Sequence, residues 1–212
     1  NLSNSIKTNK LGTVEITDQS GISDSLEVVS IPEIDINNIK FKETPAFISK
    51  SNSNPFFECL EIDGIIGSNL LKNSTIQFNS QKNEIILTDN SKNLGLKKRD
   101  AIEMKVNQIQ SNPFIPIKLI NGNHEGNEYV LFDSGDNDFY VISNTAYHQL
   151  QSQVDIFETI AKNVGTFSMG LFGTANEKEH LALKIPKLKI GDIDFKNVIF
   201  VKGFVPESFK PI

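Results

Sequence analysis

The chain has 212 residues, of which 22% are charged, and a formal net charge of −5 at pH 7. An acidic balance without a basic block disfavours nucleic acid as a partner, and no apolar run approaches the roughly 18 residues of a membrane-spanning helix. The single cysteine, Cys59, excludes an internal disulfide framework, and its apolar neighbours predict a buried thiol.

Short strands make up most of the predicted elements. Segments rich in β-branched and aromatic residues recur along the chain and are separated by turn-forming pairs such as Asn121-Gly122 and Gly191-Asp192. In chain order these predicted strands are 13–17, 25–31, 45–49, 74–79, 83–88, 113–120, 128–132, 139–143, 181–185 and 197–201. The pattern predicts a mainly β fold with several small sheets or a barrel.

Helical periodicity is rare in this sequence. A short helix is predicted from Ser68 to Lys72, and one longer helix from Asn144 to about Asn163, because apolar residues recur there on one helical face. Ser143 or Asn144 can cap the start of the longer helix.

An internal repeat organises the chain. Residues 31–47 read IPEIDINNIKFKETPAF, and residues 185–201 read IPKLKIGDIDFKNVIFV, so that Ile-Pro, two later isoleucines and Phe-Lys recur at an offset of 154 (185 minus 31). Upstream, Gly12-Thr13 matches Gly165-Thr166 at an offset of 153. Matches with this spacing predict a duplication in which the two segments form equivalent hairpins.

The same offset predicts that each copy continues outside these 212 residues. The counterpart of the IDGIIGSNLLKN segment (62–73) would begin near position 216, and the counterpart of Asp133 would lie about 21 residues before Asn1. We therefore expect the chain to be the middle of a longer, two-lobed protein. No signal peptide is visible, and the compartment is not predicted.

A polar loop stands between two apolar runs in the segment EYVLFDSGDNDFYVIS (128–143). Strands packed on both faces would bury this loop, and buried carboxylates are costly unless they are hydrogen-bonded or protonated. A D-[ST]-G loop between such strands, together with IDGIIGSNLL (62–71) and the strand pair in IQFNSQKNEIILTD (76–89), resembles the pepsin and retroviral-type aspartic peptidases, in particular bacterial two-lobed members.

The resemblance implies a bilobal, acid-protease-like β-barrel fold. Residues 1–95 would form the latter part of the first lobe, and residues 96–212 the first part of the second lobe. The implied activity is hydrolysis of peptide bonds in a peptide or protein substrate by a carboxylate-activated water, without cofactor or metal. Asp133 would be one of two catalytic acids, and the other would come from a preceding segment or from another chain.

Several residues take roles only through this resemblance. Ser134 and Gly135 would support the catalytic loop, and a substrate flap would turn at Ser20-Gly21. Asp136 stands where the family usually has Ser, Thr or Ala, and it would put a second negative charge beside the catalytic carboxylate. The segment formed by Asp63, Gly64, Ile65, Ile66 and Gly67 would pass behind the catalytic loop of its own lobe as a structural support.

Other interpretations stay open at this stage. Asp133-Ser134-Gly135 could form a simple hairpin turn, because these residue types dominate turns. Asp63 could be offered as the second acid, although the resembling segment uses it structurally. A non-catalytic peptide-binding relative and a dimer that assembles its catalytic pair are further alternatives. The histidines, 124, 148 and 180, lack partners at metal-ligand spacing, and GTFSMG (165–170) lacks the glycine of a nucleophile elbow.

Overall fold

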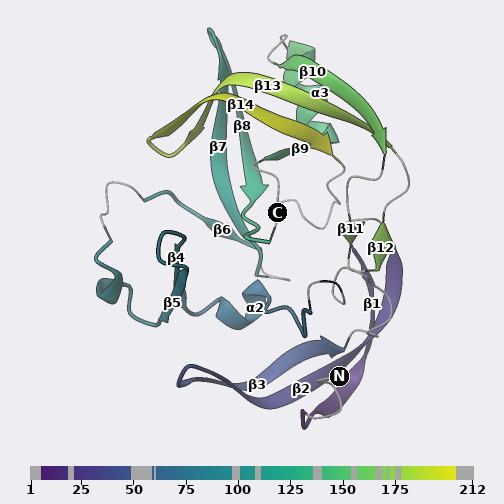
Figure 1. Cartoon of the computed structure of the whole chain (residues 1–212), viewed down its shortest axis with the longest axis vertical. Coiled ribbons are helices and arrows are strands. Elements are labelled where there is room, and N and C mark those ends of the chain that lie inside the picture. Colours follow the sequence, from purple (N-terminus) through teal and green to yellow (C-terminus); the bar gives the residue numbers. More distant parts are fainter. Residues whose placement is uncertain are drawn as a thin grey trace. The chain divides into compact units, whose positions relative to one another are not determined.

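The computed structural model describes eleven parts of the chain: residues 6–18, 22–48, 59, 61–96, 101–107, 111–135, 140–153, 157–165, 169–170, 172–174 and 178–203. The fold is mainly β, as the sequence predicts, and a segment of strand covers each of the ten predicted strand positions (Figure 1). The chain forms two compact units: Asn1–Ile66 with Gly165–Lys178, and Gly67–Val164 with Glu179–Ile212. Because 67–96 groups with the second unit and 165–178 with the first, these units differ from the lobes predicted to divide at residue 95.

The first unit is built on a three-stranded antiparallel sheet. Its strands follow chain order: β1 (Asn9–Thr17), β2 (Ser23–Ile36) and β3 (Ile39–Ile48). The short strands β11 (Met169–Gly170) and β12 (Gly173–Thr174) form a separate antiparallel pair. Among the described residues of this unit, the buried apolar side chains are Leu26 and Val29.

The second unit contains a seven-stranded sheet with a central path β6-β7-β13-β14-β9, while β8 pairs with β7 and β10 with β13. Its strands are β6 (Lys105–Val106), β7 (Pro113–Asn121), β8 (His124–Leu131), β9 (Val141–Ser143), β10 (Glu158–Gly165), β13 (Lys178–Ile190) and β14 (Ile193–Gly203). The remaining elements are α2 (Ser68–Leu71), the hairpin of β4 (Thr75–Asn79) and β5 (Glu84–Thr88), a 3-10 helix (Ser91–Leu94) and α3 (Asn144–Gln153).

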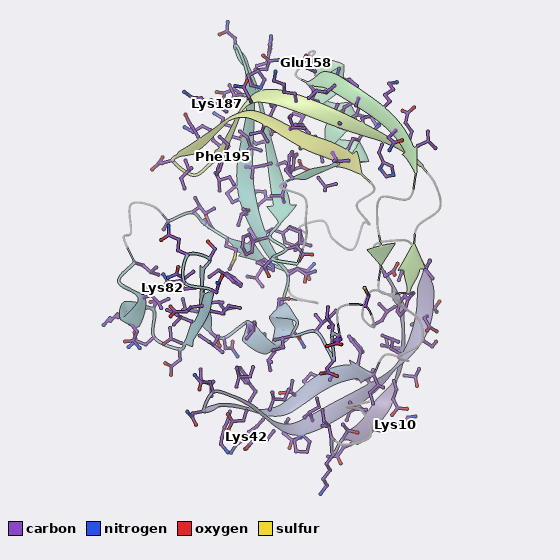
Figure 2. All side chains as sticks on the ribbon, in the orientation of Figure 1. Lys10, Lys42, Lys82, Glu158, Lys187 and Phe195 are labelled. Carbon is purple, nitrogen blue, oxygen red and sulfur yellow. The ribbon has the colours of Figure 1, made fainter. Side chains whose placement is uncertain are left out.

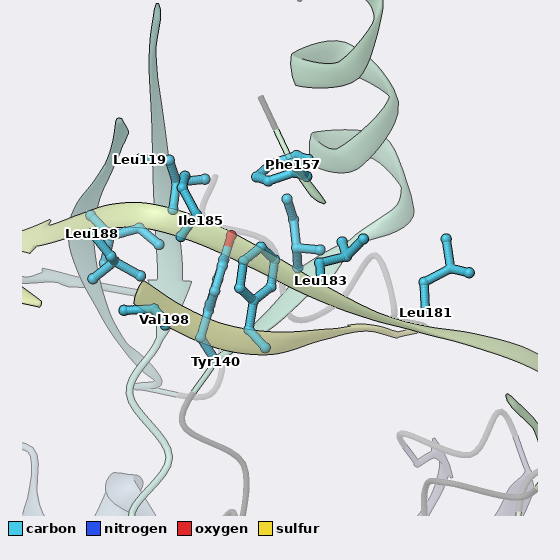
Figure 3. Close-up of a cluster of buried hydrophobic side chains, with 11 residues drawn as sticks. Leu119, Tyr140, Phe157, Leu181, Leu183, Ile185, Leu188 and Val198 are labelled. Atoms are coloured by element: carbon cyan, nitrogen blue, oxygen red, sulfur yellow. The ribbon is translucent and has the colours of Figure 1, made fainter. Parts of the chain in front are cut away.

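The hydrophobic core lies in this second unit, between the sheet and helix α3. Figure 3 shows side chains from several strands converging on it, among them Leu119, Leu183 and Ile185, which are fully buried. Leu150 of α3 packs against the cluster and against Gly126 of β8, where a Cβ atom would collide with the leucine side chain. A glycine on β8 therefore allows the helix to approach the sheet closely.

The two segments of the predicted repeat form hairpins with the same register. In β2–β3, Ile36 pairs with Ile39 next to the turn; in β13–β14, Ile190 pairs with Ile193, which is the same pairing displaced by 154. In both ladders the pairing is interrupted at the same place, opposite the proline of each Ile-Pro. There the left-handed residue is Glu43 (φ 49°) in one copy and Asn197 (φ 52°) in the other. The two segments are thus equivalent down to one unusual backbone conformation.

An ion pair occupies equivalent positions in the two hairpins with its charges exchanged. In the first copy, Lys40 Nζ lies 2.6 Å from Glu33 Oε1; in the second, Lys187 Nζ lies 2.6 Å from Asp194 Oδ2. The numbers differ by 154 in both cases, so the acid and the base stand in opposite order in the two hairpins. Figure 2 labels Lys187 on the second hairpin. The hydrogen bond from Lys187 is the largest cause of the lowered pKa of Asp194. In the first hairpin, the hydrogen bond to Glu33 is the largest cause of the raised pKa of Lys40.

The longer helix is shorter than predicted. Helix α3 covers Asn144–Gln153, and the prediction that it extends to about Asn163 is wrong, because β10 (Glu158–Gly165) pairs with β13. Thr159, Ile160 and Val164 are β-branched and suit a strand. Ile160 also falls on the apolar face of the predicted helix, which is why the periodicity favours a helix there. Pairing with a strand distant in sequence thus overrides the local periodicity. The short helix predicted at Ser68–Lys72 is confirmed by α2.

Candidate functional site

The D-[ST]-G loop begins where β8 ends. Beyond the last ladder pair, the Phe132 N–H donates to the Pro113 carbonyl at 2.8 Å, which extends the β7–β8 hairpin by one residue. Asp133 Oδ1 then accepts a hydrogen bond from the Gly135 N–H at 2.8 Å. This contact between a side chain and the backbone two residues later is the hydrogen bond of an Asx turn.

Asp133, Ser134 and Gly135 are exposed, so the expectation of a buried loop is wrong for these three residues. The physical reason is local: the Asp133 carboxylate turns back to a backbone N–H of its own loop, and water solvates the rest of it. No desolvation cost then has to be offset. Asp136, predicted to lie beside the catalytic carboxylate, falls outside the described residues.

A polar pair, of which Tyr140 is buried and Glu128 half-buried, links the segments on either side of this loop, and no sequence pattern indicated it. The Tyr140 hydroxyl donates to the Glu128 carboxylate, which joins β8, the strand before the loop, to the residue immediately before β9. Tyr140 is 6% exposed and lies within the cluster of buried side chains (Figure 3). The centroid of its ring is 4.9 Å from that of Phe200. Burial raises the pKa of Tyr140 well above its ordinary value, and the negative charge of Glu128 and the hydrogen bond raise it further.

The hydrophobic-hydrophobic-Gly segment is exposed. Asp63 and Gly64 face solvent, as do Ile65 and Ile66, whose exposed fractions are 70% and 57%, and Gly67 precedes helix α2. Among the described residues, this segment contributes nothing to the buried core. Its role as a support behind a catalytic loop stays a prediction.

The flap candidates Ser20 and Gly21 lie outside the described residues, but the strands on either side of them are described. Strands β1 and β2 pair antiparallel up to Thr17–Ser23, and the turn at Ser20-Gly21 stays a prediction. The flanking residue Asp18 is buried, and its Oδ2 accepts a hydrogen bond from the Phe172 N–H at 2.7 Å. Sequence reasoning did not single out Asp18, although an aspartate next to a turn is a common signal for backbone hydrogen bonding.

The remaining candidates do not form a site in the part of the chain that the structure describes. Cys59 is exposed, so its predicted burial is wrong. His124 and His148 are exposed, and His180 is half-buried on β13. Within the described ranges, no group of three or more His, Cys, Asp or Glu side chains could hold a metal ion, and no helix is long and apolar enough to cross a bilayer.

The exposed Asp133 turn and the Tyr140–Glu128 pair that frames it are the candidate site. One carboxylate with a water-accessible face can act as a general base or bind a cation or an amide, and a second acid is needed for peptide hydrolysis by the aspartic mechanism. Searches against protein-family models, curated proteins and solved structures each found no match to this chain.

Proposed function

We propose that the chain is the central part of a two-lobed aspartic-type peptidase, with Asp133 as one of its two catalytic acids. The other acid would come from outside these 212 residues. Substrates would be peptides or proteins bound in an extended conformation. The proposal rests on the resemblance of the FDSG loop and the DGIIG segment to this family.

The observation that carries the proposal is the pair of equivalent hairpins. Strands β2–β3 and β13–β14 pair residue for residue at one offset, with a left-handed residue at the same place in each. Duplication of one lobe motif is what a two-lobed peptidase requires, since each lobe supplies one carboxylate. Asp133 follows β8, which belongs to the same sheet as the second of the two hairpins.

The chemistry would run as follows in the assembled site. One carboxylate is ionised and removes a proton from a water, whose oxygen attacks the carbonyl carbon of the scissile peptide bond. The other carboxyl is protonated, since two like charges at that distance do not both ionise, and hydrogen-bonds the carbonyl oxygen. As the C–N bond breaks, the proton taken from the water passes to the leaving amine.

A second function is favoured by the exposure of Asp133. A peptide-binding relative that has lost its catalytic pair would keep the sheet framework but would not need a buried, rigid carboxylate. The Asx turn of Asp133 is sufficient by itself to explain the local structure. In this case the strands would bind extended peptides through their backbone groups without cleaving them.

The test compares this chain with the longer product of its gene on a mixed peptide library between pH 3 and pH 8. We expect the longer protein to cleave peptides and the Asp133→Asn variant of it to lose at least 1,000-fold in kcat/KM, roughly the effect of losing a catalytic group. The 212-residue chain alone, with one acid of the pair, should not cleave.

Asp192→Asn is the matched control, because Asp192 is another exposed aspartate in a glycine-containing turn, the one that joins β13 and β14. It should cleave at the rate of the unaltered protein. Cleavage that survives Asp133→Asn would place the chemistry elsewhere, and binding of library peptides without cleavage by the longer protein would establish the peptide-binding function instead.

A further inference from the structure

Asp18 connects two segments that correspond to each other in the repeat. We propose that the Asp18 carboxylate is a positioning group that fastens the β1–β2 hairpin to the β11–β12 pair, and so holds the hairpin in place for an extended ligand. The fastening is a property of this chain, while the effect on a ligand rests on the proposed function.

The carboxylate of Asp18 is buried and is used on both oxygens. The side chain is 7% exposed, Oδ1 accepts from the Ile22 N–H at 3.2 Å, and Oδ2 accepts from the Phe172 N–H at 2.7 Å. The first donor belongs to the same hairpin, and the second lies 154 residues further along the chain. A buried carboxylate is stable only when hydrogen-bond donors compensate for its lost hydration. The Asp18 carboxylate therefore favours the arrangement in which the Ile22 and Phe172 N–H groups both lie within hydrogen-bond distance of it.

The separation of 154 residues equals the offset of the repeated hairpins. The offset is 153 at Gly12-Thr13 and 154 from Ile31 onward, so Phe172 lies at or next to the position that corresponds to Asp18. It stands between β11 and β12, whose ladder pairs Gly170 with Gly173. The second copy contributes a backbone N–H, which any residue but proline can supply. The first copy contributes the carboxylate of Asp18, so the contact depends on the identity of the side chain at position 18 but not at position 172.

The backbone of Asp18 is also fixed within its own hairpin. Its N–H donates to the Ile22 carbonyl at 3.0 Å, next to the last ladder pair of β1 and β2, Thr17 with Ser23. The hydroxyls of these two residues share a hydrogen bond of 2.7 Å. The backbone at Asp18 is thus fixed by hydrogen bonds within the hairpin. The hydrogen bond between its carboxylate and the Phe172 N–H therefore restrains the hairpin and not only the Asp18 side chain.

Hydrogen exchange on the chain tests the fastening directly. In Asp18→Asn the side chain keeps one acceptor oxygen, so one of the two N–H groups loses its partner; in Asp18→Ala both lose it. We expect the Phe172 amide to exchange at least about tenfold faster in Asp18→Ala, the usual effect of losing one hydrogen bond to a charged group, and to be accelerated less in Asp18→Asn.

Asp24→Asn is the matched control. Asp24 lies in the same hairpin, and its carboxylate accepts a hydrogen bond from the neighbouring Ser25 N–H at 2.7 Å, so its replacement leaves the contact with Phe172 intact. Unchanged exchange of the Phe172 amide in Asp18→Ala would overturn the proposal. An equal acceleration of amides throughout the chain in Asp18→Asn would also overturn it, because it would show general destabilisation.

The consequence for a ligand is tested in the longer protein. If it cleaves peptides, Asp18→Asn should raise KM about tenfold and change kcat less than twofold, since loosening the hairpin weakens binding without touching the reacting atoms. A fall in kcat at unchanged KM would contradict this positioning role. If the longer protein does not cleave, the proposed function fails, while the exchange experiment still decides whether Asp18 fastens the two segments.

Discussion

At the scale of single residues, the Tyr140–Glu128 pair is a polar contact inside an apolar framework. Tyr140 is buried and Glu128 is half-buried, so the hydrogen bond compensates for part of the hydration that the Glu128 carboxylate loses on folding. We expect Tyr140→Phe to lower the free energy of unfolding at pH 7 by about 1–2 kcal/mol, the worth of a hydrogen bond to a charged group. Urea denaturation measures this change in the free energy of unfolding. Tyr129→Phe is the control, because it removes a tyrosine hydroxyl from the neighbouring position on β8 and leaves the hydrogen bond between Tyr140 and Glu128 in place.

The pair also sets an alkaline limit on stability. The pKa of Tyr140 is raised in the folded chain above its ordinary value of 10.0, first by burial and then by the charge of Glu128. The folded state therefore keeps its proton when the unfolded state releases it, and this contribution is intact below pH 10 and lost above it. Urea denaturation at pH 8 and at pH 10.5 measures how much free energy of unfolding is lost as the pH rises. This loss should be smaller in Tyr140→Phe than in the unaltered chain, and equal losses would exclude Tyr140 as the cause.

Asp133 behaves differently because it is exposed. Its Oδ1 accepts one hydrogen bond from the Gly135 N–H, and the Oδ1 of asparagine can accept the same bond. Asp133→Asn should therefore change the free energy of unfolding by less than about 0.5 kcal/mol. A larger loss in urea denaturation would mean that the carboxylate has a structural partner beyond this turn.

These residues show what a sequence can and cannot predict about a site. The triplet Asp133-Ser134-Gly135 is visible as a turn between strands, and the structure has a turn there. Its burial was inferred from the apolar runs on either side, but burial depends on which distant segments cover the loop. The pairing of Tyr140 with Glu128 and of Asp18 with Phe172 depends on the same long-range arrangement, which no local pattern encodes.

At the scale of elements, the best-predicted feature was the repeated hairpin. Its register follows from two copies of one pattern, so each copy supports the assignment of the other. The segment after α3 was predicted wrongly because Ile160 fits both a helical face and a strand, and only β13, which lies later in the chain, decides between them.

The left-handed residue shared by the hairpins gives a prediction at this scale. Asn197 has φ 52° and Glu43 has φ 49°, a conformation that costs alanine about 1 kcal/mol and glycine almost nothing. Asn197→Ala should lower the free energy of unfolding by about 0.5–1 kcal/mol, and Asn197→Gly should recover most of that loss. If both variants unfold alike in urea, the conformation is not maintained in solution.

At the scale of the whole molecule, the two hairpins have the same register but different surroundings. Leu183 and Ile185 of the second copy are fully buried, whereas of their counterparts Val29 and Ile31 only the valine is buried. Burial of apolar area is the main favourable term in folding, so the second unit has more of it per strand.

Unequal cores predict unequal protection of the two copies. Amides of β13–β14 should remain protected from hydrogen exchange at least tenfold longer than amides at the equivalent positions of β2–β3. Leu183→Ala, which empties part of the larger core at a cost of about 2–5 kcal/mol, should remove most of this difference. Equal protection in the unaltered chain would show that the two copies unfold together despite their different burial.

The exchanged ion pair shows what these two positions require of a side chain. Glu33 with Lys40 and Lys187 with Asp194 carry opposite charges in opposite order, so the register of the hairpin does not depend on which strand carries the base. All four side chains are at least 36% exposed, where water screens attraction and repulsion alike. Either order of charge is therefore compatible with the same backbone ladder, and the ladder, not the ion pair, holds the register.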